Sequence, residues 1–358
     1  MRDNATVLIT GGTGFIGSYL AMALLERDKQ VRVTLSDRDP DLRRVTGFEQ
    51  KFEKVKDRVA FVQGDLTILN HVLELFDQHQ PASVYHLGAL LSAGAEANPT
   101  MGFQTDLVGT WNVLEAARLW SQTSGRPPVK VLFPSTIASF GDHIPPELRE
   151  RVPNEAPQMP QTMYGVAKVA SERLGEYYHR RRWVDFRGVR FPSVIGASRG
   201  PGGTTVYATL MVQLPAQGLP YQAYVKPDQR LDVIYVKDAV RALIELHDAD
   251  DAKLGSSDSS FRRVYNIAGI RDSEGRAPTA QAIAQAVAGA LGQDLVTFNE
   301  DPALTKIVSS FGILDASLAQ KDWGWQGQFT DLDAAVANFV NDVQAFPKRL
   351  KRLELFGA

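Results

Sequence analysis

The first 190 residues alternate between short apolar runs and longer segments in which apolar residues recur at helical spacing. The runs are rich in β-branched residues, as buried parallel strands are. The runs lie at Val7–Thr10, Val31–Leu35, Val59–Gln63, Ser83–Leu87, Val129–Phe133 and Phe186–Phe191. Helical spacing is clearest in Ser18–Arg27, Asn98–Ser121 and Met163–Tyr178. This alternation predicts an α/β fold, a doubly wound parallel sheet with right-handed crossovers.

The remaining sequence predicts a small C-terminal α/β cap interleaved with the sheet. Pro192–Gln229 is rich in glycine and proline, which indicates a lid over a ligand. Two further apolar runs, Val233–Val236 and Val264–Ala268, are expected to return to the large sheet. The helical segment Thr279–Leu291 is expected to belong to the cap. We therefore expect one domain from residues 1–191 plus 232–270, and a substrate-binding cap from residues 192–231 plus 271–358.

A glycine-rich turn follows the first apolar run and precedes a helical segment. The glycines of this turn are Gly11, Gly12, Gly14 and Gly17. They allow the backbone to approach a pyrophosphate, whose charge would lie at the N-terminus of the helix. Asp37 lies 20 positions beyond Gly17, where a carboxylate can accept both ribose hydroxyls and would repel a 2′-phosphate. The pattern favours NAD over NADP. The adjacent Arg38 weakens this preference, because an arginine there could bind the 2′-phosphate of NADP. The alternative is a glycine turn that binds nothing.

Tyr164 and Lys168 stand four residues apart in Y-G-V-A-K. Residues i and i+4 share a helix face, so both side chains can point into one cleft. A phenol has a pKa near ~10, and a neighbouring ammonium favours its ionised form, which is a base. Ser135 and Thr136 end another apolar run, where a hydroxyl faces the ligand crevice of a doubly wound sheet. The alternatives are a chance Tyr–Lys pair on an exposed helix and a Ser/Thr turn bonded to backbone.

These residues together resemble the extended short-chain dehydrogenases/reductases, the superfamily that includes nucleotide-sugar epimerases and dehydratases. The resemblance runs from Val7 to about Val343. Its motifs are T-G-G-T-G-F-I-G at 10–17, G-D-L at 64–66, H-L-G-A at 86–89, P-S-T-I-A-S-F-G at 134–141 and Y-G-V-A-K at 164–168. It implies a Rossmann fold, NAD as cofactor, and a catalytic set of Thr136, Tyr164 and Lys168. The implied cofactor contacts are Gly11, Gly12, Thr13, Gly14, Phe15, Ile16, Gly17, Asp37, Arg38, Asp65, Leu66, Leu87, Gly88, Ala89, Tyr164, Lys168, Pro192 and Val194.

Within this superfamily the chain most resembles L-threonine 3-dehydrogenases of the short-chain type. The similar stretches are H-L-G-A-L-L-S-A at 86–93, G-T-W-N-V-L-E-A-A at 109–117, T-M-Y-G-V-A-K at 162–168, G-G-T-T-V-Y-A at 202–208 and K-D-W-G-W at 321–325. The resemblance implies oxidation of the β-hydroxyl of L-threonine to 2-amino-3-ketobutyrate. The implied substrate contacts are Ser92, Thr136, Arg190, Thr204, Thr205 and Phe311. Arg190 suits a carboxylate, but it also ends a strand and can instead pair with a neighbouring acid.

Four positions depart from the patterns of these families. Asp106 stands where the family usually has an asparagine that takes part in proton relay, and an ionised carboxylate accepts but cannot donate. Gly88 replaces a usual alanine, and Phe311 stands where threonine dehydrogenases often have tryptophan, which changes the pocket width. Leu231 occupies the position of the arginine that binds the diphosphate of nucleotide sugars, while Arg230 lies one residue earlier. The last departure disfavours a nucleotide-sugar substrate.

Composition limits the remaining possibilities. The chain has 358 residues, 44% hydrophobic and 22% charged, with a formal net charge of −2. These values suit a globular enzyme and give no electrostatic reason to bind nucleic acid or membrane. It contains no cysteine, so disulfides and thiolate metal sites are excluded, and the histidines show no metal-binding spacing. No apolar stretch approaches the length of a membrane helix. We expect a cytoplasmic protein without a metal. The resemblance to the superfamily implies a homodimer, paired through Asn98–Ser121 and Met163–Tyr178.

Three functional hypotheses remain from the sequence. The first is an NAD-dependent dehydrogenase of a small hydroxy compound, which the resemblance implies is L-threonine. The second is a redox-neutral epimerase or dehydratase, or a sugar-acid dehydrogenase, because these enzymes use the same Thr136, Tyr164 and Lys168. The third is an NAD-sensing regulatory protein without catalysis. The Tyr–Lys pair opposes the third hypothesis, since such relatives usually lack it.

Overall fold

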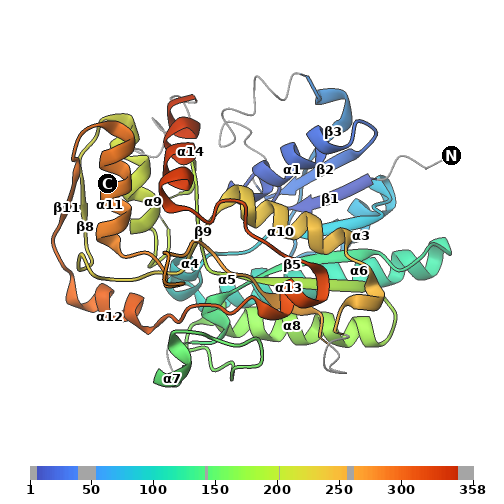
Figure 1. Ribbon diagram of the computed structural model, residues 1–358. Coiled ribbons are helices and arrows are strands. Elements are labelled where there is room, and N and C mark those ends of the chain that lie inside the picture. The colour runs from blue at the N-terminus through green and yellow to red at the C-terminus, as the bar shows by residue number, and fades with distance from the viewer. Residues whose placement is uncertain (1–5, 39–53, 142–143, 201, 256–261, 346–358) are drawn as a thin grey trace.

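The computed structural model describes residues 6–38, 54–141, 144–200, 202–255 and 262–345. In this part of the chain the centre is a seven-stranded parallel sheet with the order β10-β6-β5-β4-β1-β2-β3 (Figure 1). The strands are β1 (Thr6–Thr10), β2 (Arg32–Asp37), β3 (Val59–Gln63), β4 (Ser83–His86), β5 (Lys130–Thr136), β6 (Asp185–Phe191) and β10 (Val264–Asn266). This sheet confirms the predicted doubly wound α/β fold.

Strand β1 lies at the point where the chain order reverses. It pairs with β2 on one side and with β4 on the other, in parallel register. Leu8 and Ile9 point to opposite faces and are both fully buried, which explains why the run is apolar without alternation. In open α/β sheets ligands bind beyond the carboxyl ends of the strands at such a switch point. The glycine turn follows β1 at this end.

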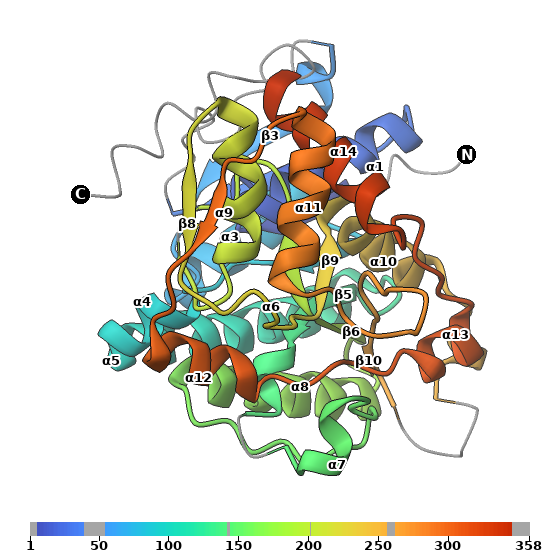
Figure 2. The same ribbon diagram turned by 60° about the vertical axis from the view of Figure 1, so that its left-hand side comes forward.

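Helices cover both faces of the sheet (Figures 1 and 2). One face is covered by α1 (Phe15–Arg27) and α10 (Val236–Asp248), which pack against each other. The other face is covered by α3 (Leu69–His79), α6 (Gly109–Ser124) and α8 (Met163–Arg180). Both layers are apolar where they meet the sheet, as the periodicity of the sequence predicts.

The predicted helix Asn98–Ser121 is interrupted. It consists of α5 (Pro99–Gly102), a π-helical turn at Phe103–Val108 and then α6. A π turn inserts an extra residue into a helix and is common at functional sites. The periodicity of the sequence predicts one continuous helix here and did not locate this turn. The turn contains Asp106.

A smaller α/β cap is formed by later segments of the chain. Strand β7 (Ser193–Ile195) pairs with β9 (Val233–Tyr235), and β8 (Tyr221–Ala223) pairs with β11 (Val296–Phe298). These strands share a core with the cap helices α9 (Tyr207–Gln213), α11 (Ala280–Leu291) and α14 (Leu332–Ala345). Two further helices, α12 (Pro302–Ser310) and α13 (Ser317–Trp323), link β11 to α14.

The prediction that Val233–Val236 returns to the large sheet is wrong, whereas that for Val264–Ala268 is correct. β10 extends the large sheet beside β6, but β9 pairs with β7 in a separate two-stranded sheet. Strand β6 ends at Phe191, directly before Pro192, and the next strand, β7, pairs with β9. A short apolar run has the same pattern in either position, so its partner is decided by the fold.

Shorter elements connect these layers. They are α4 (Ser92–Ala97), α7 (Pro146–Arg149) and 3₁₀ turns at Lys56–Arg58, Ile137–Ser139, Pro215–Gln217 and Asp251–Lys253. Within the ranges that the structure describes, no helix combines the length and apolar character needed to cross a membrane.

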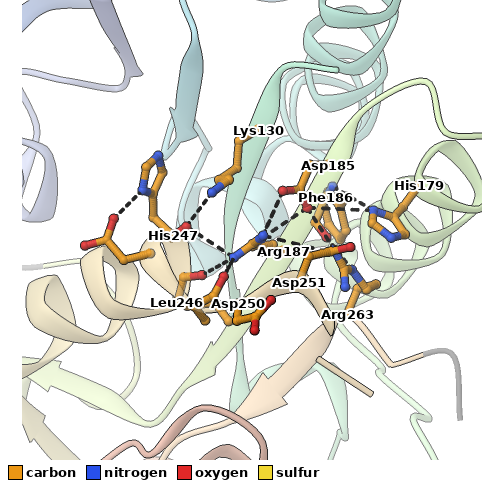
Figure 3. A network of polar contacts seen from close by, with 12 residues as sticks. Lys130, His179, Asp185, Phe186, Arg187, Leu246, His247, Asp250, Asp251 and Arg263 are labelled. Atoms are coloured by element: carbon orange, nitrogen blue, oxygen red, sulfur yellow. Dashed lines mark hydrogen bonds and ion pairs between the residues drawn. The ribbon is translucent and has the colours of Figure 1, made fainter. Parts of the chain in front are cut away.

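At the amino end of β6, a network of polar contacts joins the sheet to the end of α10 (Figure 3). Arg187 is only 2% exposed and pairs with Asp185, with an Nη2–Oδ2 distance of 2.8 Å. Its Nη1 donates to the carbonyl oxygens of Leu246 at 2.8 Å and Ala249 at 2.6 Å. Arg263 also pairs with Asp185 at 2.8 Å. Because the last carbonyls of a helix lack intrahelical partners, Arg187 completes the C-terminus of α10.

Candidate active site

A cavity of about 580 Å³ lies beyond the carboxyl ends of the central strands. It extends from the glycine turn and Asp37 at one end to the lid and Phe311 at the other. Among the residues predicted from the sequence to contact cofactor or substrate, all line it except Gly12, Thr13 and Arg190. The cavity therefore unites segments that are far apart in the chain, at the switch point expected for a ligand.

Gly11 and Gly17 shape the end of the cavity nearest to α1. Gly11 has φ +64, and a Cβ on it would lie 2.8 Å from the amide nitrogen of Gly88. A Cβ on Gly17 would lie 2.5 Å from the carbonyl oxygen of Gly11. The turn therefore needs glycine at both positions. It leads directly into α1, whose first residue, Phe15, precedes the predicted start at Ser18. Phe15, Ile16 and Gly17 line the cavity, so the N-terminus of α1 borders it, and a helix N-terminus suits a phosphate.

Two predicted contacts, Gly12 and Thr13, support the site from outside the cavity lining. The amide of Gly12 donates to the carbonyl oxygen of Ser36 at 3.2 Å. The Thr13 hydroxyl donates to Asp37 Oδ2 at 2.7 Å, and its amide donates to the same oxygen at 3.3 Å. These bonds hold the Asp37 carboxylate at the end of β2, where it lines the cavity beside Arg38. The arrangement fits a carboxylate that receives ribose hydroxyls.

Tyr164, Lys168 and Thr136 converge at the opposite end of the cavity. The Thr162 side chain caps α8 by accepting from the Gly165 amide at 3.0 Å, which places Tyr164 in the first turn. Lys168 lies one turn later and donates from Nζ to the carbonyl oxygen of Pro134 at 2.9 Å. Its Nζ is 5.6 Å from the centre of the Tyr164 ring. Thr136, the last residue of β5, forms a side-chain hydrogen bond with the Tyr164 hydroxyl.

The environment shifts the pKa values of both groups on α8. Burial, followed by the charge of Asp106, raises the pKa of Tyr164 to about 12, while the bond to Thr136 and the charge of Arg199 act in the opposite direction. Burial lowers the pKa of Lys168 to about 8. The expectation that the lysine lowers the pKa of the phenol is therefore not met by the protein alone, because burial outweighs it. The charges of two acids, Asp106 and then Glu172, favour the Lys168 ammonium and oppose the effect of burial.

Asp106 lies behind the reactive end of the cavity and is 3% exposed. Its Oδ1 accepts from the amide of Leu90 at 2.6 Å, whereas its Oδ2 is buried and has no hydrogen-bond partner among the described residues. Burial raises the pKa of this carboxyl, and the charge of Lys168 opposes the rise. A buried carboxylate oxygen without a donor is costly. The departure from asparagine thus places a third ionisable group beside Tyr164 and Lys168.

Arg190 does not reach the cavity. It is 3% exposed and forms a two-pronged pair with Glu172, with distances of 3.0 Å from Nε and 2.7 Å from Nη2. Its Nη1 donates to the carbonyl oxygen of Asn154 at 2.9 Å. Ser135 also donates to Glu172. Ser135 therefore supports the ion pair, whereas Thr136 bonds to Tyr164. The structural alternative for Arg190 therefore holds, and we do not retain it as a substrate contact.

The other predicted substrate contacts surround the reactive end. Ser92 begins α4, Phe311 follows the last turn of α12, and Thr204 and Thr205 belong to the lid; all four line the cavity. The Thr205 hydroxyl is 2.8 Å from that of Ser193, so it is held by the start of β7. This end therefore offers hydroxyl groups and one aromatic wall.

Arg199 is a lining residue that the sequence did not single out. It lies in the lid, and its positive charge acts on the Tyr164 hydroxyl. A single cation between glycines and prolines has no periodicity or motif to mark it, so only the folded lid shows that it faces the cavity. Leu90, Leu91 and Thr105 also line the cavity without having been predicted.

The fold agrees with comparisons to known proteins. The sequence profile described as the NAD dependent epimerase/dehydratase family matches residues 7–268. The chain belongs to this family. It is 34% identical to the mitochondrial L-threonine 3-dehydrogenase of Bos taurus over 342 residues, 95% of this chain and 83% of that protein.

Two solved structures are similar to the present chain over nearly its whole length. The holo form of a GalE-like L-threonine dehydrogenase from Cupriavidus necator has a TM-score of 0.80 at 32% identity, covering 94% of this chain and 99% of that one. A metagenomic L-threonine 3-dehydrogenase described as monomeric has a TM-score of 0.78 at 27% identity, covering 94% and 98%. The chain is thus an NAD-dependent enzyme of the extended short-chain type.

Membership of the NAD dependent epimerase/dehydratase family agrees with the shape of the cavity. The glycine turn leaves room for a pyrophosphate that a Cβ would fill, and Asp37 is fixed where an adenosine ribose would need acceptors. The reactive side chains lie at the far end of the same cavity. The residues present therefore fit NAD along the whole cavity.

Proposed function

We propose that this enzyme oxidises the 3-hydroxyl of L-threonine to the ketone, 2-amino-3-ketobutyrate, with NAD as hydride acceptor. The observation that carries the proposal is the convergence of Tyr164, Thr136 and Lys168 at one end of a cavity that fits NAD. Similarity to L-threonine dehydrogenases over 95% of the chain supports the choice of substrate. It does not favour the redox-neutral and regulatory alternatives.

The side chains would act on the proton and on the position of the substrate. The Thr136 hydroxyl, at the carboxyl end of β5, would bind the substrate oxygen beside Tyr164. The ionised phenol would take the hydroxyl proton while the hydrogen on the same carbon leaves as hydride. Lys168, held by the carbonyl of Pro134, would stabilise the phenolate by its charge. NAD supplies the acceptor for the hydride.

We also propose which residues contact each part of the ligands. The turn at residues 11–17 would bind the pyrophosphate, Asp37 the adenosine ribose, and Asp65 and Leu66 the adenine. The segment Leu87–Ala89, with Pro192 and Val194, would border the nicotinamide side. Ser92, Thr204, Thr205 and Phe311 would enclose the amino acid. Asp37 favours NAD over NADP, because its charge would repel a 2′-phosphate.

The direct test follows NADH formation with a panel of hydroxy compounds. The panel contains L-threonine, serine, 3-hydroxy acids, sugar acids and UDP-sugars. We expect NADH to accumulate with L-threonine and not with UDP-sugars. Turnover of any compound without net NADH would instead support the redox-neutral alternative. Failure of NAD to bind in a calorimetric titration would reject the whole proposal.

We further propose that the enzyme forms a homodimer. Large apolar side chains with exposed fractions of 39–47% lie on α5, the π-helical turn that follows it, α6 and α8, which pack side by side. They are Met101, Phe103, Trp111, Val166 and Tyr177. Such a patch is typical of an interface between copies. Sedimentation equilibrium should give twice the chain mass of 39.4 kDa, and a single-chain mass would match the relative described as monomeric.

A further inference from the structure

The lid holds Arg199 rigidly beside the reactive end of the cavity. Its Nη1 donates to the carbonyl oxygen of Val194 at 2.7 Å and to the Ser193 hydroxyl at 3.2 Å. Gly203 lies beside the guanidinium, since a Cβ on it would be in van der Waals contact with Nη2 at 3.6 Å. The backbone before it is also fixed, because Ser198 has φ +74 and its amide donates to Gln213 Oε1 at 3.0 Å. These contacts fix the position of the Arg199 guanidinium at the cavity.

Arg199 has no carboxylate partner among the residues that the structure describes. Burial lowers its pKa to about 10, so it remains charged at neutral pH. By contrast, Arg190 and Arg271 each form a close pair with a buried acid. A cation withdrawn from water without an anion is unfavourable unless a ligand supplies one. The guanidinium is planar and can bind a carboxylate with two parallel hydrogen bonds.

The acids that line the cavity are either distant from this end or already paired. Within the described ranges they are Asp37, Asp65 and Asp232. Asp37 and Asp65 belong to the end where β2 and β3 finish. Asp232 accepts from Arg271 Nη1 at 2.6 Å and Nη2 at 3.1 Å, and from the amide of Leu314 at 2.8 Å. Asp106 is not part of the lining. A substrate ammonium would therefore meet hydroxyls and carbonyls, but no free carboxylate.

Resting on the proposed function, we propose that Arg199 binds the substrate carboxylate and that the amino group is not required for recognition. The substrate class is then 3-hydroxycarboxylates, of which L-threonine is one member. The reaction is unchanged: the C–H hydrogen on the hydroxyl-bearing carbon leaves as hydride to NAD, the hydroxyl proton goes to Tyr164, and a 3-ketoacid is formed. Arg199 in the lid selects substrates with a carboxylate. The substituent at the 2-position is selected only by whether it fits the cavity.

The first experiment compares L-threonine with (R)-3-hydroxybutyrate, which has the same hydroxyl configuration and lacks the amino group. We expect kcat/KM for the two acids to agree within about tenfold, which corresponds to about 1.4 kcal/mol or less. Oxidation of L-threonine with (R)-3-hydroxybutyrate at least a hundredfold poorer would overturn this inference and leave the proposed function standing. If neither acid gives NADH, the proposed function fails, whatever the state of Arg199.

The second experiment separates carboxylate binding from other roles of Arg199. Arg199→Gln should lower kcat/KM for both acids about 10- to 100-fold, mainly through KM, as the loss of charge-assisted hydrogen bonds does. The same variant should leave kcat/KM for the uncharged amide, (R)-3-hydroxybutyramide, within about threefold, and should leave NAD affinity unchanged. Arg199→Lys should recover part of the lost affinity for the acids.

A matched control is Arg27→Gln, which removes an exposed guanidinium at the end of α1, where Arg27 pairs with Asp248. It should leave all three substrates unaffected. An Arg199→Gln protein that loses acid and amide activity equally, or that loses NAD affinity, would show that the arginine supports the lid or the cofactor. Either result would remove the carboxylate assignment even if the variant folds normally.

Discussion

The two ends of the central sheet use arginine in opposite ways. At the amino end, Arg187 satisfies its guanidinium with Asp185 and with the last carbonyls of α10 (Figure 3). At the carboxyl end, Arg199 has two oxygen partners and no acid among the described residues. Burial of a fully paired charge holds two elements in one position. Burial of an unpaired charge beside a cavity leaves binding energy for a ligand.

The acids show the same contrast. Asp185 is held by Arg187 and Arg263, and these contacts lower its pKa although burial opposes them. Within the part of the chain that the structure describes, Asp106 has one donor, the Leu90 amide, and a second oxygen without a partner, and burial raises its pKa. Asp185 is thus fully paired at the amino end, whereas Asp106, beside Tyr164 and Lys168, has an incompletely satisfied carboxyl.

The largest effect is expected at the phenol. Tyr164→Phe should lower kcat by about 10²- to 10⁴-fold, because the proton acceptor is lost. NAD affinity and thermal stability should change little. Tyr177→Phe, on the same helix but 47% exposed, should keep full activity. Full activity of the Tyr164 variant would show that another group takes the proton. The carboxyl end of the sheet would then no longer differ from the amino end by carrying the reactive phenol.

The next effect tests the amino end. Arg187→Gln should destabilise the fold by about 3–5 kcal/mol, because Asp185 is left in a partly buried site with one partner fewer. This is measured as the free energy of unfolding in urea. The folded fraction should keep its kcat and KM, since no residue of this network lines the cavity.

The control for this change is Arg27→Gln. The pair of Arg27 with Asp248 is about half exposed, so its loss should cost about 0–1 kcal/mol. A small effect at Arg187, or a lowered kcat in the folded protein, would contradict a purely structural role for the amino end.

A smaller effect concerns the cofactor. Asp37→Ser removes the charge held by Thr13 and should raise the NADP-to-NAD ratio of kcat/KM at least about tenfold, or about 1.4 kcal/mol. The exposed Asp57→Ser should leave the ratio unchanged. An unaltered ratio in the first variant would mean that Arg38 or other groups set the preference.

The smallest effect concerns pH. The charge of Asp106 raises the pKa of Tyr164, and the base acts only when ionised, so activity grows as pH rises toward that pKa. Asp106→Asn removes the charge and should move this rise to lower pH, with higher kcat/KM at neutral pH. The pH profile of kcat/KM measures the shift. A shift to higher pH would show that the support of Asp106 for the Lys168 ammonium dominates.

Much of the candidate site could be predicted from short stretches of the sequence. The strands that lead into the glycine turn and into Thr136 are continuous apolar runs, and the predicted ends agree with β1 and β5 within a few residues. Tyr164 and Lys168 share a face because of helix geometry alone. These features depend on neighbours within one turn or one strand, so sequence spacing predicts them.

Only the tertiary structure decided the features that depend on partners far away in the chain. β9 pairs with β7 and not with the large sheet, although its apolar pattern suits both. Arg190 lies in an ion pair with Glu172, whereas Arg199 in the lid faces the cavity. The Rossmann fold, the glycine turn after β1 and the shared helix face of Tyr164 and Lys168 follow from local sequence patterns. Which charges are paired depends on packing, because a guanidinium has no spacing rule that names its acid.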